Sequence, residues 1–323
     1  MSASVQETYE GREFRSLQMY LNSKFFEKLW STDLHNKARA IIDSLNLECE
    51  IIGPDDESKI IREIRAEISS GLLGKSGPSR LQTWNRGWAE NQDSFSVKKS
   101  PDSLIPKYFG KSRINRLEQK FVLAKSQDYE LLMLRAIQSW VFTQYFEKLD
   151  HVYEYGCGTG HNLVFLHELF PNLQLKGLDW SVSSQSLIGE VKIQYPEIKI
   201  AAENFDLFNP NFDIDIPTNA GVLTVASLEQ LGNQHEKFVT YLMQKRPKIV
   251  VHIEPFQDLL DPRVPVDRVS IDYMVERNYI SGYVESIQSL EQDNRVKIMM
   301  LQRSFVGSKY IDGYTLLVWS PIG

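Results

Sequence analysis

The sequence predicts an α/β protein with a mostly parallel sheet. From residue 151 onward, short apolar runs alternate with helical stretches, and several of the runs end in a glycine, an acid or a proline. Buried parallel strands have this nearly continuous apolar composition, and strands that alternate with helices form βαβ units. Residues before 128 have mainly helical patterns, which predict a helical N-terminal cap on the sheet.

The first βαβ unit is the most informative segment. A β-prone run at 152–155 enters the glycine-rich turn 156–160, and a helical stretch then leads to a second run at 173–178 that ends in Asp179. The first turn of such a unit can carry a ligand, and an acid at the tip of the second strand can hold a ribose. We therefore expect a nucleoside-like cofactor here.

The spacing of this turn argues against a dinucleotide. The pyrophosphate-binding pattern G-x-G-x-x-G requires a third glycine where this chain has His161. Glu154, two residues before the first glycine, would repel a pyrophosphate and attract a cationic ligand. An NAD-dependent or nucleotide-sugar enzyme with the same βαβ turn is the weaker alternative.

This acid–glycine–acid arrangement resembles the first motif of the class I S-adenosylmethionine-dependent methyltransferases. Over residues 128–323, the resemblance implies a Rossmann-like seven-stranded sheet whose last strand is antiparallel. It implies the cofactor S-adenosyl-L-methionine, with Glu154 helping to hold the methionine end and Asp179 binding both ribose hydroxyls. The cofactor-binding residues that we predict are Glu154, Gly156, Cys157, Gly158, Gly160, Asp179, Trp180, Asp206, Leu207 and Ser227.

The third strand, expected at 198–202, is followed by the predicted adenine site. Asp206 and Leu207 are assigned to it because D-L-F-N-P resembles the family's form here, with Asn204 and Phe205 as rivals. A turn rich in Asn, Asp and Pro that binds nothing is the alternative.

The remaining elements complete the sheet. Two further apolar strands are expected at 220–226 and 248–254. A helix at 267–290, broken near Asn278 or Gly282, precedes two β-prone segments at 296–304 and 313–319. The last two resemble the hairpin that closes the family's sheet.

Three residues near the ends of the fourth and fifth strands are candidate bases: Glu229, His252 and Glu254. Ligands bind beyond the carboxyl ends of such strands, and an oxygen acceptor usually needs a base. His252 has an ordinary pKa near neutrality, but strand alternation gives it an equal prospect of being a core imidazole. We see no metal-binding cluster, and Cys157 lacks a positioned base and is not expected to be a nucleophile.

The N-terminal region, residues 1–127, is predicted to be a mainly helical cap. Helices are expected at 12–45 and 56–73, a long functional loop at 74–103, and a further helix at 128–149 that leads into the first core strand. Within the loop, Trp84, Arg86 and Trp88 are predicted to bind substrate as part of a lid. Alternatively, both indoles pack the cap onto the sheet.

Composition limits the class of function. The chain has 323 residues, 42% of them hydrophobic, and a net charge of −6, which suits one large globular enzyme and disfavours a nucleic-acid substrate. The basic run 107–116 fits either an anion-binding segment or a solvated loop. With no apolar run of membrane-spanning length and two cysteines, a cytoplasmic protein is expected.

The function predicted is transfer of a methyl group from S-adenosyl-L-methionine to a small or medium-sized acceptor, at oxygen. A non-catalytic methyltransferase-like subunit that binds a partner is a further alternative. The intact acid–glycine–acid set disfavours it, because a scaffold has no physical need for Glu154 and Asp179 together.

Overall fold

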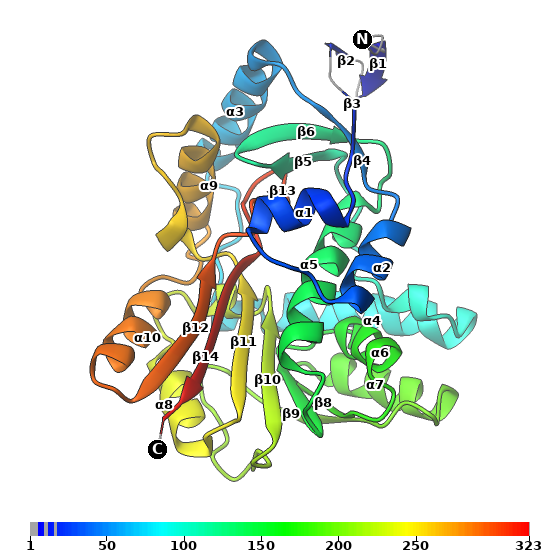
Figure 1. Cartoon of the computed structure of the whole chain (residues 1–323), viewed down its shortest axis with the longest axis vertical. Coiled ribbons are helices and arrows are strands. Elements are labelled where there is room, and N and C mark those ends of the chain that lie inside the picture. Colours follow the sequence, from blue (N-terminus) through cyan, green and yellow to red (C-terminus); the bar gives the residue numbers. More distant parts are fainter. Residues whose placement is uncertain (1–5, 10–11, 16–17, 323) are drawn as a thin grey trace.

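The computed structural model describes residues 6–9, 12–15 and 18–322. Its centre is a seven-stranded sheet in the order β12-β14-β11-β10-β7-β8-β9, in which β14 alone runs antiparallel to its neighbours (Figure 1). The predicted α/β fold is therefore confirmed. The strands are β7 (His151–Tyr155), β8 (Gln174–Asp179), β9 (Ile200–Asn204), β10 (Ala220–Val225), β11 (Ile249–Glu254), β12 (Val296–Gln302) and β14 (Thr315–Pro321).

Both faces of this sheet are buried, as the apolar strands predict. Successive side chains of β10 and β11 alternate between two cores: Leu223 and Val251 belong to one, whereas Val222 and Val250 belong to the other. The first core is covered by α5 (Tyr129–Tyr145), α6 (His161–Leu169) and α7 (Val182–Gln194). The second core is covered by α8 (Glu236–Lys245) and α10 (Tyr283–Gln292).

The helix predicted at 267–290 is broken as expected. It forms α9 (Pro265–Glu276) and α10, and Asn278 and Gly282 between them have φ values of 54° and 74°. Left-handed backbone of this kind ends a right-handed helix, and glycine and asparagine adopt it most easily.

The N-terminal region contributes a second sheet that the helical pattern did not predict. Its order is β13-β5-β6-β4-β3, so the C-terminal strand β13 (Val306–Ser308) pairs with β5 of the N-terminal region. Helices α1 (Ser23–Trp30), α2 (Asn36–Ser44) and α3 (Pro54–Ser69) accompany the sheet. The other strands are β3 (Gln18–Tyr20), β4 (Glu48–Ile51), β5 (Ile114–Leu117) and β6 (Lys120–Ala124), and β1 (Gln6–Tyr9) and β2 (Arg12–Arg15) form a separate pair.

The expectation of one helical segment at 12–45 is therefore wrong in part. Strands β2 and β3 precede two short helices, and residues 16–17 lie outside the described part. The helix expected at 56–73 is confirmed as α3. The boundary at residue 127 stays a prediction, since β13 joins the two regions in one sheet.

The long loop predicted at 74–103 is wrong over most of its length, because Leu81–Lys98 forms helix α4. Its inward side chains are Trp84, Trp88, Asn91 and Phe95, spaced at four, three and four residues, which is a helical stripe. The polar Asn91 conceals the stripe in the sequence. Once folded, its amide donates to the carbonyls of Ser103 and Ile105, both at 2.8 Å.

His252 on β11 is a core residue, which corrects its assignment as a catalytic base. Its side chain is fully buried: Nδ1 is 2.8 Å from the Thr224 hydroxyl, and Nε2 is 2.8 Å from the Tyr283 hydroxyl. The Trp319 indole N–H, which is a donor only, also points at Nε2 from 3.1 Å. The Nε2 lone pair is therefore occupied within the fold, and burial lowers the pKa of His252 to about 3.

Replacing His252 should remove a pH-dependent contribution to stability. The pKa of His252 is far below its ordinary 6.5, so the unfolded chain binds a proton first and stability falls as the pH drops below that value. Between pH 7 and pH 5 this one group costs about 2 kcal/mol of unfolding free energy. In urea denaturation, the stability difference between the wild type and His252→Gln should shrink by that amount. A difference that is unchanged between the two pH values contradicts the assignment.

Gly87 offers a test of helix α4. A Cβ added there meets no atom within 4 Å and the backbone is helical, so Gly87→Ala should raise the unfolding free energy by about 0.5–1 kcal/mol in urea denaturation. Gly71 is the matched control: it has equally open surroundings but a φ of +69°. Gly71→Ala should therefore destabilise the protein. Equal effects of the two substitutions would argue against a helix at Gly87.

Candidate functional site

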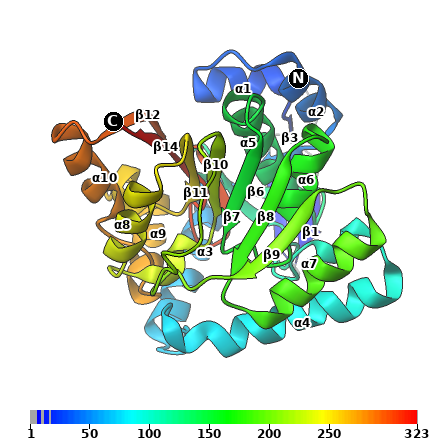
Figure 2. The same ribbon diagram turned by 90° about the horizontal axis from the view of Figure 1, so that it is seen from below.

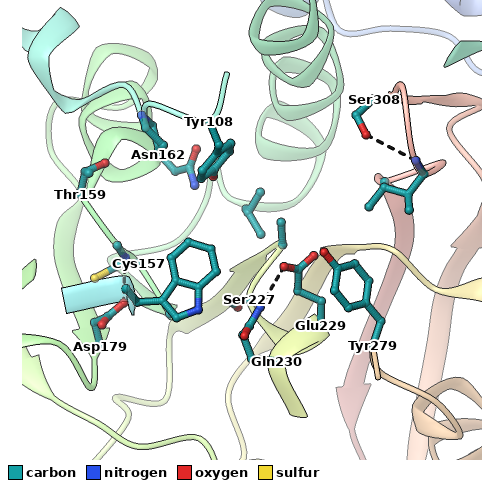
Figure 3. Close-up of a pocket in the computed structure, with 18 of the residues that line it drawn as sticks. Tyr108, Cys157, Thr159, Asn162, Asp179, Ser227, Glu229, Gln230, Tyr279 and Ser308 are labelled. Carbon is teal, nitrogen blue, oxygen red and sulfur yellow. Dashed lines mark hydrogen bonds between the residues drawn. The ribbon is translucent and has the colours of Figure 1, made fainter. Parts of the chain in front are cut away.

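A cavity of about 370 Å³ lies beyond the carboxyl ends of β7 and β10. These two neighbouring strands mark the point where the chain reverses direction across the sheet, because β8 continues to one side and β11 to the other. Open α/β sheets bind ligands at this switch point. Figure 3 shows that the cavity extends from Asp179 and Cys157 at one end to Tyr279 and Ser308 at the other.

The glycine-rich turn after β7 is packed too closely for side chains. Gly156 and Gly158 have φ values of 71° and 53°. A Cβ on Gly156 would lie 2.4 Å from the Cβ of Ser227, and one on Gly158 would lie 2.9 Å from the Trp88 ring. These glycines therefore let the backbone itself form the wall of the cavity. Gly160, predicted as a third contact, has a φ of 77° and caps α6 without lining the cavity.

Asp179, at the tip of β8, lines the cavity and is braced by two backbone groups. Its Oδ2 accepts the Gly158 N–H at 3.0 Å, and its Oδ1 accepts the Ser181 N–H at 2.8 Å. The side chain is 4% exposed, and burial raises the pKa of Asp179 to about 6 although both hydrogen bonds act to lower it. Each oxygen retains a lone pair for a ligand hydroxyl.

Glu154 lies behind the turn rather than in the cavity wall. Its Oε1 accepts from the Asn162 amide at 2.7 Å, and Asn162 lines the cavity. The other oxygen of Glu154 is buried without a hydrogen-bond partner, and burial raises the pKa of the carboxyl to about 8. A buried acid with an unused oxygen fits a cationic ligand nearby, because a positive charge favours its ionised form.

Rings and apolar side chains form the wall next to Asp179. Trp180 and Phe208 stack with their centroids 5.7 Å apart, and both line the cavity together with Phe205 and Leu207. Asp206, predicted as the adenine ligand, is not among the lining residues. Its carboxylate is used in a turn, where it accepts the Phe208 N–H at 2.8 Å and the amide of Asn209 at 3.1 Å.

The far end of the cavity is centred on Glu229. This side chain is 7% exposed and accepts from the Gln230 amide at 3.0 Å, and the Tyr279 ring lies beside it (Figure 3). Burial, together with repulsion from Glu254, raises the pKa of Glu229 to about 8. Of the predicted catalytic residues, Glu229 lines the cavity and His252 does not.

Glu254 holds Ser227 in place and does not line the cavity. Its Oε1 accepts the Ser227 backbone N–H at 3.1 Å, and the Ser227 hydroxyl is 3.3 Å away. Ser227 in turn lines the cavity and donates to the carbonyl of Tyr155 at 2.9 Å. Glu254 of β11 therefore holds the segment that follows β10, and its predicted role as a base stays a prediction.

Only two of the three predicted substrate-binding residues of α4 line the cavity. Trp84 and Trp88 stack 5.3 Å apart and line the cavity, whereas Arg86 is exposed outside it. A helix turns by about 100° per residue, so the residue midway between two inward tryptophans faces away. Cys157 lines the cavity with a pKa raised by burial, which suits a packing role.

A wall that the sequence did not predict comes from the segment between β12 and β14. Ser308 and Tyr314 of this segment line the cavity, and the Tyr314 hydroxyl donates to Glu130 at 2.9 Å. Gly307 is the residue in the sequence that could indicate this close packing, because a Cβ there would collide with the carbonyl of Ile311. The basic run 107–116 lies partly here: Tyr108 and Lys111 line the cavity, while the run ends in β5.

Two buried arginines hold this wall in place. Arg303 binds both Asp267 of α9 and Asp312, with side chains that are almost fully buried. Arg116 of β5 donates to the carbonyls of Lys309 and Tyr310, at 3.2 and 2.9 Å. The second sheet and α9 thereby position the far end of the cavity.

Some features are absent from the described residues. None of their helices combines the length and the apolar character that a membrane crossing requires. The same residues contain no group of three or more His, Cys, Asp or Glu side chains that is arranged to hold a metal ion.

The known proteins to which this chain is similar are methyltransferases. No family model matches the chain. Over 116 residues, it is 25% identical to a trans-aconitate 2-methyltransferase of Escherichia coli O157:H7 (strain EC4115 / EHEC) and 24% identical to one of Shigella flexneri serotype 5b (strain 8401). Each match covers 36% of this chain and 43% of the relative, so the chain spans less than half the length of these relatives.

Solved structures with a related shape are more distant. A SAM-dependent methyltransferase from Aquifex aeolicus has a TM-score of 0.40 at 14% identity, covering 58% of this chain and 89% of its own. An O-methyltransferase family protein from Burkholderia thailandensis has a TM-score of 0.45 at 14% identity, covering 81% and 71%. The strand order, the glycine turn and the sequence similarity together confirm the resemblance of this chain to the class I methyltransferases.

Proposed function

We propose that the protein transfers a methyl group from S-adenosyl-L-methionine to an oxygen atom of a small or medium-sized acceptor. One observation carries this proposal: a single cavity joins the braced carboxylate of Asp179 to the buried carboxyl of Glu229. The first group suits a ribose, and the second suits removal of a proton from an acceptor.

The cofactor end fits the chemistry of a nucleoside with a cationic tail. Asp179 would accept the ribose hydroxyls, the Trp180 and Phe208 rings would cover the adenine, and Glu154 with Asn162 would favour the positive end. Bound there, the sulfonium supplies an already activated methyl group. The remaining task of the protein is to align the acceptor and exclude water.

The acceptor end favours a ring-bearing hydroxyl compound. Tyr108, Tyr279 and Tyr314 supply aromatic walls, and Glu229 and Glu130 are acids whose pKa values burial raises to about 8 and about 7. We propose that ionised Glu229 takes the hydroxyl proton as the oxygen–methyl bond forms and the sulfur–methyl bond breaks.

Two further features are part of this proposal. Both cysteines, Cys49 and Cys157, are buried and unpaired, which fits the reducing cytoplasm. The acidic net charge of −6 fits a small-molecule acceptor rather than a nucleic acid.

Removal of the Asp179 carboxylate should weaken cofactor binding. Asp179→Ala leaves ribose hydroxyls without a partner, which should cost about 1–3 kcal/mol in calorimetry with S-adenosylhomocysteine. Asp206→Asn is the matched control. Asp206 is an acid that follows β9 and lies outside the cavity, so this variant should bind the ligand like the wild type. Wild-type affinity in Asp179→Ala would refute the ribose assignment, and binding of NAD in place of S-adenosylhomocysteine would refute the proposed function.

The role of Glu229 predicts the pH dependence of turnover. An acid with a pKa near 8 is half ionised at that pH and mostly ionised above it, so kcat/KM should rise with pH through about 8 and level off above it. Glu229→Gln should lower kcat by about 100-fold and abolish the rise. The acceptor for this assay comes from a metabolite-extract screen for products heavier by one methylene group.

The matched control for this test is Glu130→Gln. It removes the other raised carboxyl of the acceptor end, which is bonded to Tyr314, and should keep the rise with pH near 8. If Glu229→Gln and the wild type share one pH profile, Glu229 is not the base.

A further inference from the structure

Helix α4 of the N-terminal region lies alongside α7, the helix that follows the cofactor strand β8 (Figure 2). Two sets of polar contacts join them. Near the start of α7, Asn85 faces Ser181 and Ser183, and farther along, Gln92 and Ser96 both donate to Glu190. The first set lies directly beside Asp179.

A single oxygen of Asn85 collects three hydrogen bonds. Asn85 Oδ1 accepts from the Ser181 hydroxyl at 2.9 Å, and from the Ser183 backbone N–H and hydroxyl, both at 3.1 Å. The backbone N–H can only donate, so it fixes the amide with its oxygen toward α7. Asn85 thereby satisfies a free N–H in the first turn of a helix to which it does not belong.

These contacts lead directly to the ribose-binding carboxylate. Ser181 donates its hydroxyl to Asn85 and its backbone N–H to Asp179 Oδ1. The other donor to the Asp179 carboxylate is the Gly158 N–H, and the Trp88 ring of α4 packs against that glycine. Helix α4 therefore contacts both residues whose backbone N–H groups hold Asp179, through two residues on one face.

We propose that Asn85 is a positioning residue for the cofactor, acting through Ser181 on the carboxylate of Asp179. This inference rests on the proposed function. It makes α4 a fixed wall of the cofactor site rather than a cover over the acceptor. Trp88, predicted to bind substrate, then supports the glycine turn from the same helix.

The test is the affinity for S-adenosylhomocysteine, measured by calorimetry on the full chain. Asn85→Ala should weaken binding by about tenfold. Gln92→Ala is the matched control, because it removes a contact between the same two helices two turns away and should change affinity by less than about threefold. Asn85→Gln keeps the amide but displaces its oxygen, and it should lose affinity as Asn85→Ala does. This variant tests the inference if the Asn85→Ala protein does not fold.

A double-mutant cycle separates positioning from general loosening. If Asn85 acts through Asp179, Asn85→Ala should cost no further affinity in a protein that already carries Asp179→Ala. Additive losses, or equal losses for Asn85→Ala and Gln92→Ala, overturn the inference. The proposed function fails on a different result, which is a wild-type protein that does not bind S-adenosylhomocysteine.

Discussion

The two backbone hydrogen bonds to Asp179 connect the main parts of the site. One donor belongs to the glycine turn after β7, and the other to the start of α7. A carboxylate at the tip of β8 thereby fixes the loops that follow two neighbouring strands. The turn can approach this closely because Gly158 has no side chain, and Trp88 of α4 occupies the space that a Cβ would require. The shape of the cofactor end therefore follows from one buried acid and the glycines beside it.

Buried acids without full compensation give the cavity its chemical character. Burial raises the pKa values of Glu154, Asp179 and Glu229, so it acts against their ionised forms. A cationic ligand near them would restore the ionised forms. His252 on β11 differs from Glu154, because both of its ring nitrogens have hydrogen-bond partners within the fold.

The N-terminal region forms part of the cavity wall. Its helix α4 forms a wall at the cofactor end, and its strand β5 supports the far wall of the cavity through Arg116. Strand β13 lies between β12 and β14 in the sequence, but it pairs with β5 of the second sheet. It carries Ser308 to the cavity. The two regions therefore both contribute walls to the cavity.

The sequence determined the sheet, the glycine turn and Asp179, because these depend on local patterns: apolar runs, glycine spacing and an acid at a strand end. It also identified Glu229 as a candidate, but could not separate it from His252 and Glu254, since burial and hydrogen-bond partners come from distant strands. Helix α4 is not predictable from the apolar pattern, because the polar Asn91 interrupts its apolar stripe and finds its partners only after folding. The acceptor wall and the contacts of Asn85 likewise join segments separated by about a hundred residues or more in the chain. Only the tertiary structure decided them, because such pairings are set by packing and leave no periodic trace in the sequence.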